Sequence, residues 1–146
     1  MDADLSHEPE SIPRFIDALI DSDFVIGTRM RGGKSENRGS RLLVSILGNL
    51  LAAKMIPTGL SEYTTSYRIF SYKTLSVLEH FYVTEEGYSF FMEIVNFLFL
   101  QGLTLKEIPI YFRSRFSGKS KIPRRQVVKS VRVLLKLTLQ RLILRR

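Results

Sequence analysis

The chain has 146 residues, enough for one domain with a hydrophobic core, and its 45% hydrophobic and 25% charged residues are typical of a globular protein. It contains no cysteine, which excludes disulfides and thiolate metal sites. Its two histidines, interpreted as surface or satisfied polar residues, are too few for a histidine-built zinc site. The net charge of +8 is uneven, because no acid follows Arg113. Such a basic arm favours nucleic acid, an anionic lipid surface or a phosphorylated ligand as partner.

The first half of the chain predicts a helix, a strand, a loop and a second helix. Apolar residues at helical spacing predict helices over Glu8 to Ile20 and over Ser40 to Met55. Asp23 to Thr28 predicts a strand, and the charged, glycine-rich segment Arg29 to Arg38 predicts a mobile loop. The expected apolar sides of the two helices are Ile12, Phe15, Ile16, Leu19 and Ile20, and Leu43, Ile46, Leu47, Leu50 and Leu51.

The second half alternates strands and helices. Ser66 to Phe70 predicts a short strand, and Lys73 to Phe81 and Tyr88 to Leu100 predict helices. Leu103 to Phe112 predicts a strand in which Pro109 indicates an edge position or a bulge. This alternation predicts an α/β layer architecture, although only three short strands are expected.

A basic loop over Phe116 to Pro123 leads to a last helix over Gln126 to Leu144. Its apolar side is expected to contain Val127, Val131, Leu134, Leu135, Thr138 and Leu142, and its polar side Lys129, Arg132, Lys136 and Gln140. This pattern predicts a basic amphipathic helix that docks at a membrane surface, with packing on the domain as the alternative. No segment reaches the ~18 uninterrupted apolar residues that a membrane span needs, and the early acidic residues argue against a secretory signal. We therefore expect a cytoplasmic protein, peripheral at the membrane.

Two carboxylates near the amino terminus form an Asp-x-Asp pair, Asp2 and Asp4. On a turn, such a pair can share one hard divalent cation, Mg²⁺ or Mn²⁺, through oxygen ligands. The cation would bridge to a diphosphate and offset its charge as it leaves. A solvated acidic terminus is the alternative interpretation.

Several basic residues are candidates for holding a phosphate. Arg29 follows the first predicted strand, and Arg41 and Ser45 are four residues apart, hence on one helical face. The arginine fork suits phosphate oxygens. The basic loop adds further candidates for the same anion: Arg115, Ser120 and Lys121. Solvated surface charge is the alternative for each of them.

Six segments, in order and covering nearly the whole chain, resemble the family 2 glycosyltransferases that act as dolichyl-phosphate mannose synthases, and their bacterial polyprenyl-phosphate relatives. The segments are MDADLSHEP, DFVIGTRMRGG, SRLLVSILGNLLA, SEYTTSYRIFS, GYSFFMEI and EIPIYFRSRFSGKSKI. Jointly they are specific for this family, whereas no single one is.

The resemblance implies the C-terminal part of a GT-A-type domain, with residues 1–123 as catalytic portion and 124–146 as membrane-proximal helix. It implies inverting transfer of a sugar to polyprenyl or dolichyl phosphate, with GDP-mannose as donor and UDP-sugars as rivals. The implied metal ligands are Asp2 and Asp4, with Ser6 near the cation. The implied acceptor-phosphate residues are Arg29, Arg41, Ser45 and Arg115, joined by Ser120 and Lys121, and the residues assigned to catalysis are Asp4 and Arg115.

The chain departs from the family in two places. The family's N-terminal nucleotide-binding portion is absent, so we expect a fragment that is inactive alone and exposes apolar surface. Glu62 stands where the family usually has an aspartate, one methylene shorter. Glu93 lies in an otherwise apolar helix and needs a partner, for which Arg68 is a structural candidate; a site role is the alternative.

Two other function classes remain open at this point. One is a non-catalytic half-domain that binds lipid phosphate or membrane and pairs with a separate nucleotide-binding half or membrane subunit. The other is a nucleic-acid binder. The sequence argues against the latter, because its basic residues are not interleaved with exposed aromatics and no recognition-helix motif is present.

Overall fold

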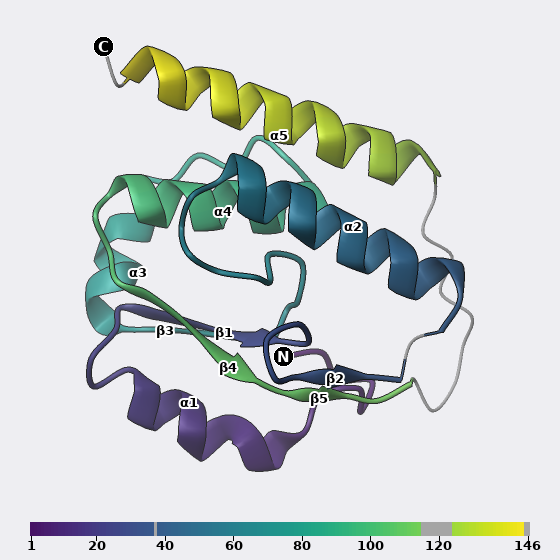
Figure 1. The fold of residues 1–146 in the computed structure, drawn as a ribbon. Coiled ribbons are helices and arrows are strands. Elements are labelled where there is room, and N and C mark those ends of the chain that lie inside the picture. Colours follow the sequence, from purple (N-terminus) through teal and green to yellow (C-terminus); the bar gives the residue numbers. More distant parts are fainter. Residues whose placement is uncertain (37, 115–123, 145–146) are drawn as a thin grey trace.

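A buried strand, β1 (Phe24–Thr28), forms the centre of a three-stranded sheet in the computed structural model (Figure 1). It pairs antiparallel with β3 (Arg68–Phe70) and parallel with β4 (Leu105–Pro109). The structure describes residues 1–36, 38–114 and 124–144, without the side chains of 40–41, 124–126 and 140–144. All five residues of β1 are buried, as expected of an apolar strand covered on both faces. β4 ends at Pro109 and is an edge strand of the sheet, where a residue without a backbone N–H is tolerated.

A second, two-stranded sheet corrects the sequence-based prediction of three strands. β2 (Lys34–Ser35) lies parallel to β5 (Tyr111–Phe112), within the segment that was expected to be a mobile loop. The backbone between β1 and β2 passes so close to Thr28 that residue 33 must be glycine. A Cβ at this position would lie only 2.0 Å from the carbonyl oxygen of Thr28. The described part of the chain therefore contains five strands.

The helices cover the sheet on two sides (Figure 1). On one side lie α2 (Ser40–Met55), α4 (Tyr88–Leu100) and α5 (Arg124–Leu144). On the other lies α1 (Ile12–Ala18), which follows the 3₁₀ turn η1 (Pro9–Ser11). The short helix α3 (Tyr72–Leu78) follows β3, and the Ser71 side chain caps it by accepting from the Thr74 N–H.

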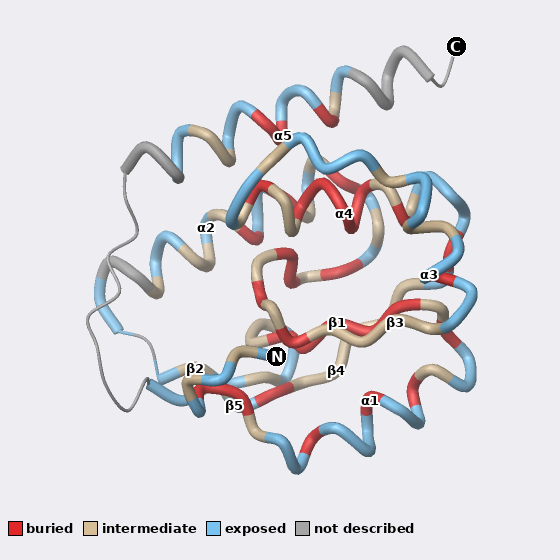
Figure 2. Tube along the Cα trace, turned by 180° about the vertical axis from the view of Figure 1, so that it is seen from behind, coloured by how far each residue is buried: buried red, intermediate tan, exposed pale blue. Residues whose placement is uncertain are grey.

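The hydrophobic core lies mainly between β1 and the α2–α4–α5 layer, as the buried segments in Figure 2 show. Each large apolar side chain buried there contributes about 1.5–3 kcal/mol. Its members include Phe24, Ile26, Ala52, Ile56, Met92, Val95, Leu98, Val133, Leu134 and Leu137. A smaller cluster under α1 contains Phe15, Ala18, Val25, Tyr67 and Ile110.

Several apolar residues predicted to face the core are exposed instead. On α1, Phe15 is buried, whereas Ile16 is 54% exposed, and Ile20, which lies beyond the end of α1, is 87% exposed. On α5, Leu135 is exposed, and Val133 and Leu137 are buried in its place. Helical periodicity identifies an apolar side, but the neighbouring elements decide which part of that side they cover.

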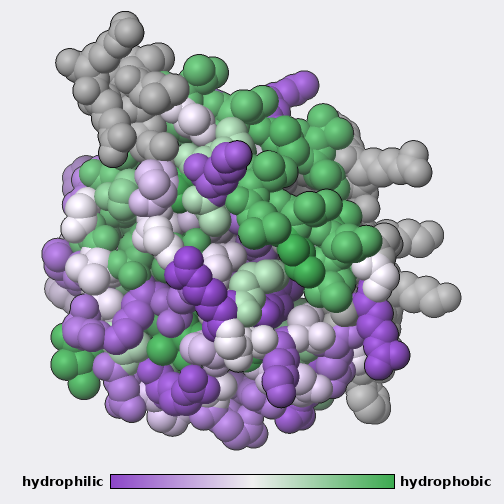
Figure 3. Space-filling view, viewed as in Figure 1, coloured by the Kyte–Doolittle hydropathy of each residue, from purple (hydrophilic) through white to green (hydrophobic). Residues whose placement is uncertain are grey.

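The exposed apolar residues of α2 and α5 form one surface, the α2–α5 apolar face. Figure 3 shows apolar side chains gathered where these helices lie. This face contains Leu43, Val44, Leu47, Leu50 and Leu51 of α2 and Val127, Val128, Val131, Leu135 and Leu139 of α5. Arg132 and Lys136 of α5 are also exposed. Among the described residues, no helix has the length and apolarity needed to cross a bilayer.

Candidate functional site

A cavity of about 540 Å³ lies between the amino-terminal segment, the loops at one end of the sheet, and helices α2, α4 and α5. The amino-terminal segment and the loops contribute most of its polar groups: Asp2, His7, Arg29, Thr64, Thr65, Ser66 and Ser114. Strand β5 contributes the apolar ring of Phe112. The helices contribute mainly apolar groups: Val44, Leu47, Gly48, Leu51, Phe91, Met92, Val127, Val131 and Leu134, with Ser45, Tyr88 and Ser130. The cavity therefore suits a ligand that is polar at one end and apolar at the other.

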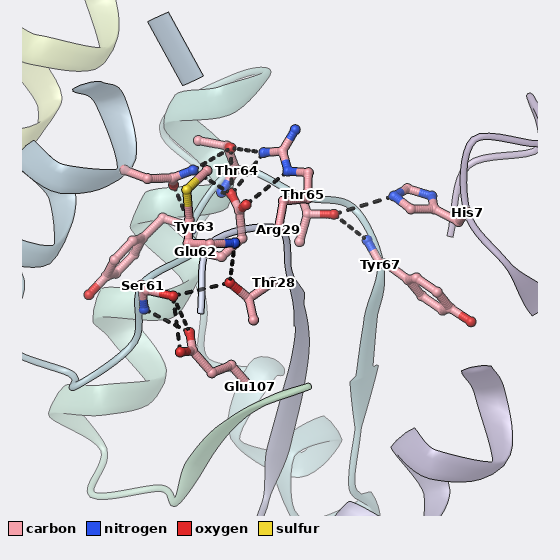
Figure 4. Close-up of polar contacts among 12 residues, drawn as sticks. His7, Thr28, Arg29, Ser61, Glu62, Tyr63, Thr64, Thr65, Tyr67 and Glu107 are labelled. Carbon is pink, nitrogen blue, oxygen red and sulfur yellow. Dashed lines mark hydrogen bonds and ion pairs between the residues drawn. The ribbon is translucent and has the colours of Figure 1, made fainter. Parts of the chain in front are cut away.

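Arg29, which directly follows β1, is held by a buried carboxylate (Figure 4). Its Nε and Nη2 donate to Glu62 Oε2 and Oε1, both at 2.9 Å, and Nη2 also donates to Thr64 Oγ1 at 2.9 Å. Glu62 is fully buried and also accepts from Asn49 Nδ2 at 2.7 Å and from the Thr64 hydroxyl at 2.7 Å. The guanidinium is thereby fixed in position, and its charge is compensated.

The ionisation of Glu62 follows from the same contacts. Burial alone raises the pKa of its carboxyl, but the charge of Arg29 and the hydrogen bonds from Arg29 and Thr64 outweigh it. The pKa of Glu62 therefore lies below its ordinary value, and the side chain is ionised at neutral pH.

Arg68 braces the turn that carries Glu62. Its Nη2 donates to the carbonyl of Tyr63 at 2.7 Å, its Nε to that of Thr65 at 2.8 Å, and its Nη1 to that of Phe91 at 3.2 Å. Burial lowers the pKa of Arg68 to about 9, and the charge of Glu62 opposes this shift. Arg68 thus ties the turn to α4.

The expected pairing of Glu93 with Arg68 is wrong. Glu93 instead accepts from the N–H of Thr84 at 3.3 Å and from the Thr84 hydroxyl, which fastens the segment before α4 to that helix. The donors of Arg68 are used by backbone carbonyls, and neither residue is among the described residues that line the cavity. The contacts of both side chains are structural.

The amino-terminal segment folds back toward the turn at residues 64–67. The N–H of Asp2 donates to His7 Nδ1 at 3.2 Å, and His7 Nε2 lies 3.3 Å from Thr65 Oγ1. Asp4 Oδ1 accepts from both the N–H and the hydroxyl of Ser6, at 3.1 and 2.5 Å. These bonds bring Asp2 to the cavity that Arg29 also lines, whereas Ser6 is fully buried with its hydroxyl directed at Asp4.

The acidic residues of this segment, Asp2 and Asp4, are the candidate ligands of a hard divalent cation. In the described part of the chain, no group of three or more His, Cys, Asp or Glu residues is arranged to hold a metal ion. Mg²⁺, however, is commonly held by one or two carboxylates together with substrate phosphates and water. Asp2 lines the cavity, whereas Asp4 is not among the described residues that line it.

Comparison with known proteins identifies relatives with a common activity. The undecaprenyl-phosphate mannosyltransferase of Micrococcus luteus is 36% identical over 124 residues, which are 84% of this chain and 51% of that protein. The polyprenol monophosphomannose synthase of Mycolicibacterium smegmatis is 32% identical over 125 residues, 84% of this chain and 47% of that protein. This chain is therefore homologous to part of each of these two proteins. It spans about half the length of these curated relatives, and no protein-family model matches it.

The resemblance drawn from six segments is thus confirmed, and the residues that the sequence assigned to the site can be located in the structure. Asp2, Arg29 and Ser45 line one cavity. The other phosphate candidates lie outside the described residues: Arg115, Ser120 and Lys121, and the side chain of Arg41. Sequence reasoning missed the roles of Asn49 and His7. Asn49 could have been found from its position four residues after Ser45, on the same helical face.

This chain is expected to lose stability in mild acid through His7. Burial lowers the pKa of this imidazole below 6.5, and Asp2 opposes the shift only in part. As the pH falls below 6.5, the unfolded chain binds a proton that the folded chain does not, so stability decreases until the folded pKa is passed. We expect His7→Asn, which can still accept from the Asp2 N–H, to lose less stability than the wild type between about pH 8 and pH 5 in urea denaturation. Equal losses would contradict this.

Proposed function

We propose that this chain is the acceptor-binding part of an enzyme that transfers mannose from a nucleotide sugar to polyprenyl phosphate. The observation that carries the proposal is the cavity, in which Asp2, Arg29 and Ser45 share a space with apolar walls from α2, α4 and α5. A phosphate joined to a prenyl chain has the same division into polar and apolar parts. The names of the relatives point to the same acceptor class.

The chemistry requires positioning more than proton transfer. The second pKa of a phosphate monoester is about 6, so the acceptor is largely ionised near neutrality and needs no strong base. One of its oxygens bonds to the anomeric carbon while the bond from that carbon to the diphosphate oxygen breaks, and the diphosphate leaves with the electron pair. The displacement is in line and inverts the anomeric centre. Holding both partners in this geometry is the main contribution of the protein.

Within this scheme, Arg29 orients the phosphate. Because Glu62 compensates its charge, Arg29 offers a fixed donor group and little net attraction. Ser45 adds a hydroxyl from the neighbouring wall. We assign the remaining positive charge to Arg41 and Arg115, as the family resemblance implies. Asp2 and Asp4 would hold Mg²⁺ or Mn²⁺, which supplies charge neutralisation at the diphosphate when bound.

The mixed sheet and its helices support assignment to the C-terminal part of a GT-A-type domain. The α2–α5 apolar face supports a peripheral position at a membrane, because its exposed leucines and valines can enter the lipid interface. Arg132 and Lys136 add about 1 kcal/mol each of attraction to an anionic surface. Such a position would bring the cavity to the headgroup of a lipid acceptor.

The decisive experiment measures mannose transfer from GDP-mannose to undecaprenyl phosphate. The chain is assayed alone and together with the N-terminal half of the Micrococcus luteus relative, with Mg²⁺, with Mn²⁺ and after chelation. We expect a lipid-linked product only when the second half and a divalent cation are present, and loss of product with Arg115→Ala.

The same assay separates the alternatives. The assay is repeated with UDP-glucose in place of GDP-mannose. If product forms with UDP-glucose and not with GDP-mannose, the proposed donor is wrong and the proposed acceptor still stands. Binding of prenyl phosphate without transfer under any of these conditions would favour a non-catalytic lipid-phosphate-binding half-domain. Absence of both binding and transfer would contradict the proposal.

A further inference from the structure

Gly48 lies in the interior of α2, where glycine destabilises a helix relative to alanine. A helical glycine is commonly explained by the close approach of another part of the chain. A Cβ built on Gly48, however, has no described heavy atom within 4 Å beyond its own helix backbone and chain neighbours. At Gly27, by contrast, the Cβ would lie 2.9 Å from Ile110 Cδ1. Close packing therefore explains why position 27 is glycine, and it does not explain why position 48 is glycine.

The space beside Gly48 belongs to the cavity. Gly48 lines it together with Leu47 and Leu51 of the same helix, and Met92 of α4 and Val131 of α5 form other parts of the apolar wall. Ser45, which also lines the cavity, precedes Gly48 by three residues, or about 4.5 Å along the helix axis. The gap at Gly48 thus adjoins a hydroxyl of the proposed phosphate site and continues into apolar surroundings.

We propose that Gly48 keeps open the passage by which the prenyl chain of the acceptor leaves the phosphate site, and so determines which phosphate esters bind. The inference rests on the proposed function, because the occupant is the chain attached to the bound phosphate. Prenyl chains carry methyl branches from their first unit onward, so the segment next to the phosphate is wide. A side chain at position 48 would occupy the volume that this segment needs.

The test compares a phosphate ester with a prenyl chain and one without. Binding of farnesyl phosphate, below its micelle concentration, and of methyl phosphate is measured by NMR titration of the 146-residue chain. We expect Gly48→Leu to weaken farnesyl phosphate binding at least about tenfold and methyl phosphate binding less than about twofold. The matched control is Lys54→Leu, which adds the same side chain to an exposed position of α2 and should bind both ligands as the wild type does.

Each result bears on a different claim. If the wild type binds neither ester, the proposed function fails and this inference fails with it. If the wild type prefers farnesyl phosphate and Gly48→Leu keeps that preference, or weakens both ligands equally at an unchanged Tm, the role of Gly48 is refuted and the proposed function stands. Should Gly48→Leu not fold, Gly48→Ala decides. We expect it to raise Tm and weaken only farnesyl phosphate, by about threefold, and unchanged binding would refute the inference.

Discussion

Replacing Glu62 with alanine is expected to lower the free energy of unfolding by about 3–5 kcal/mol, among the largest effects a single change can have in this chain. Glu62 is fully buried and accepts from Arg29, Asn49 and Thr64. Its removal leaves the Arg29 guanidinium, whose side chain is 10% exposed, without its compensating charge. Urea denaturation followed by circular dichroism measures the change.

Two comparisons make this prediction specific. Glu62→Gln retains an acceptor for Asn49 and loses the charge, so its effect should be smaller than that of Glu62→Ala. Asp21→Asn removes an exposed ion pair with Lys106, in which the lysine donates at 2.8 Å, and should have little effect. If Glu62→Ala and Asp21→Asn change stability equally, the buried pair does not have the importance assigned to it.

The pH dependence of this effect has a definite sign. The folded pKa of Glu62 lies below the ordinary value of 4.5, so its contribution to stability is fully present above that value. The contribution is lost as the pH falls through the folded pKa. The stability difference between wild type and Glu62→Gln should therefore stay constant from neutral pH to about pH 5 and shrink only in stronger acid.

Apolar spacing in the sequence correctly predicted those helices and strands that are determined by residues close together in the chain. Helices α2 and α4 have the predicted bounds, and β1 differs from its prediction by one residue. The two-residue strand β2 escaped prediction, because it exists only through pairing with β5, more than 70 residues along the chain. Its sequence, Lys34-Ser35, carries no strand signal of its own.

The candidate site shows the same division. The sequence pointed to Arg29 and Glu62 for separate reasons. Arg29 matches an arginine of the family that the chain resembles, and Glu62 stands where that family usually has an aspartate. That the two form an ion pair across 33 residues depends on how β1 and the turn after α2 are brought together. The sequence also suggested Arg68 as partner for Glu93, although Thr84, nine residues before Glu93, was nearer along the chain. Contacts between distant segments are set by packing, which a local pattern does not encode.

Asp4→Asn is expected to reduce mannose transfer by about 10²–10³-fold in the two-part enzyme, with most of the loss in kcat. Asparagine retains an oxygen that can accept from the N–H and hydroxyl of Ser6, so the turn at the amino terminus should persist. What it lacks is the negative charge that a hard cation requires. Steady-state kinetics at several Mg²⁺ concentrations should show that excess metal restores only part of the rate.

The variant Ser6→Ala tests whether Asp4 acts through its hydrogen bonds within the turn or through its negative charge. It removes the hydroxyl that donates to Asp4 at 2.5 Å and leaves the carboxylate in place. If Asp4 acts through a cation, this variant should lose less than about tenfold in kcat, well below the loss in Asp4→Asn. If both variants lose the same activity, Asp4 acts by shaping the segment that carries Asp2 to the cavity. If Asp4→Asn transfers mannose at the full rate, the cation is not held here, and the charge at the leaving diphosphate must be met by arginines alone.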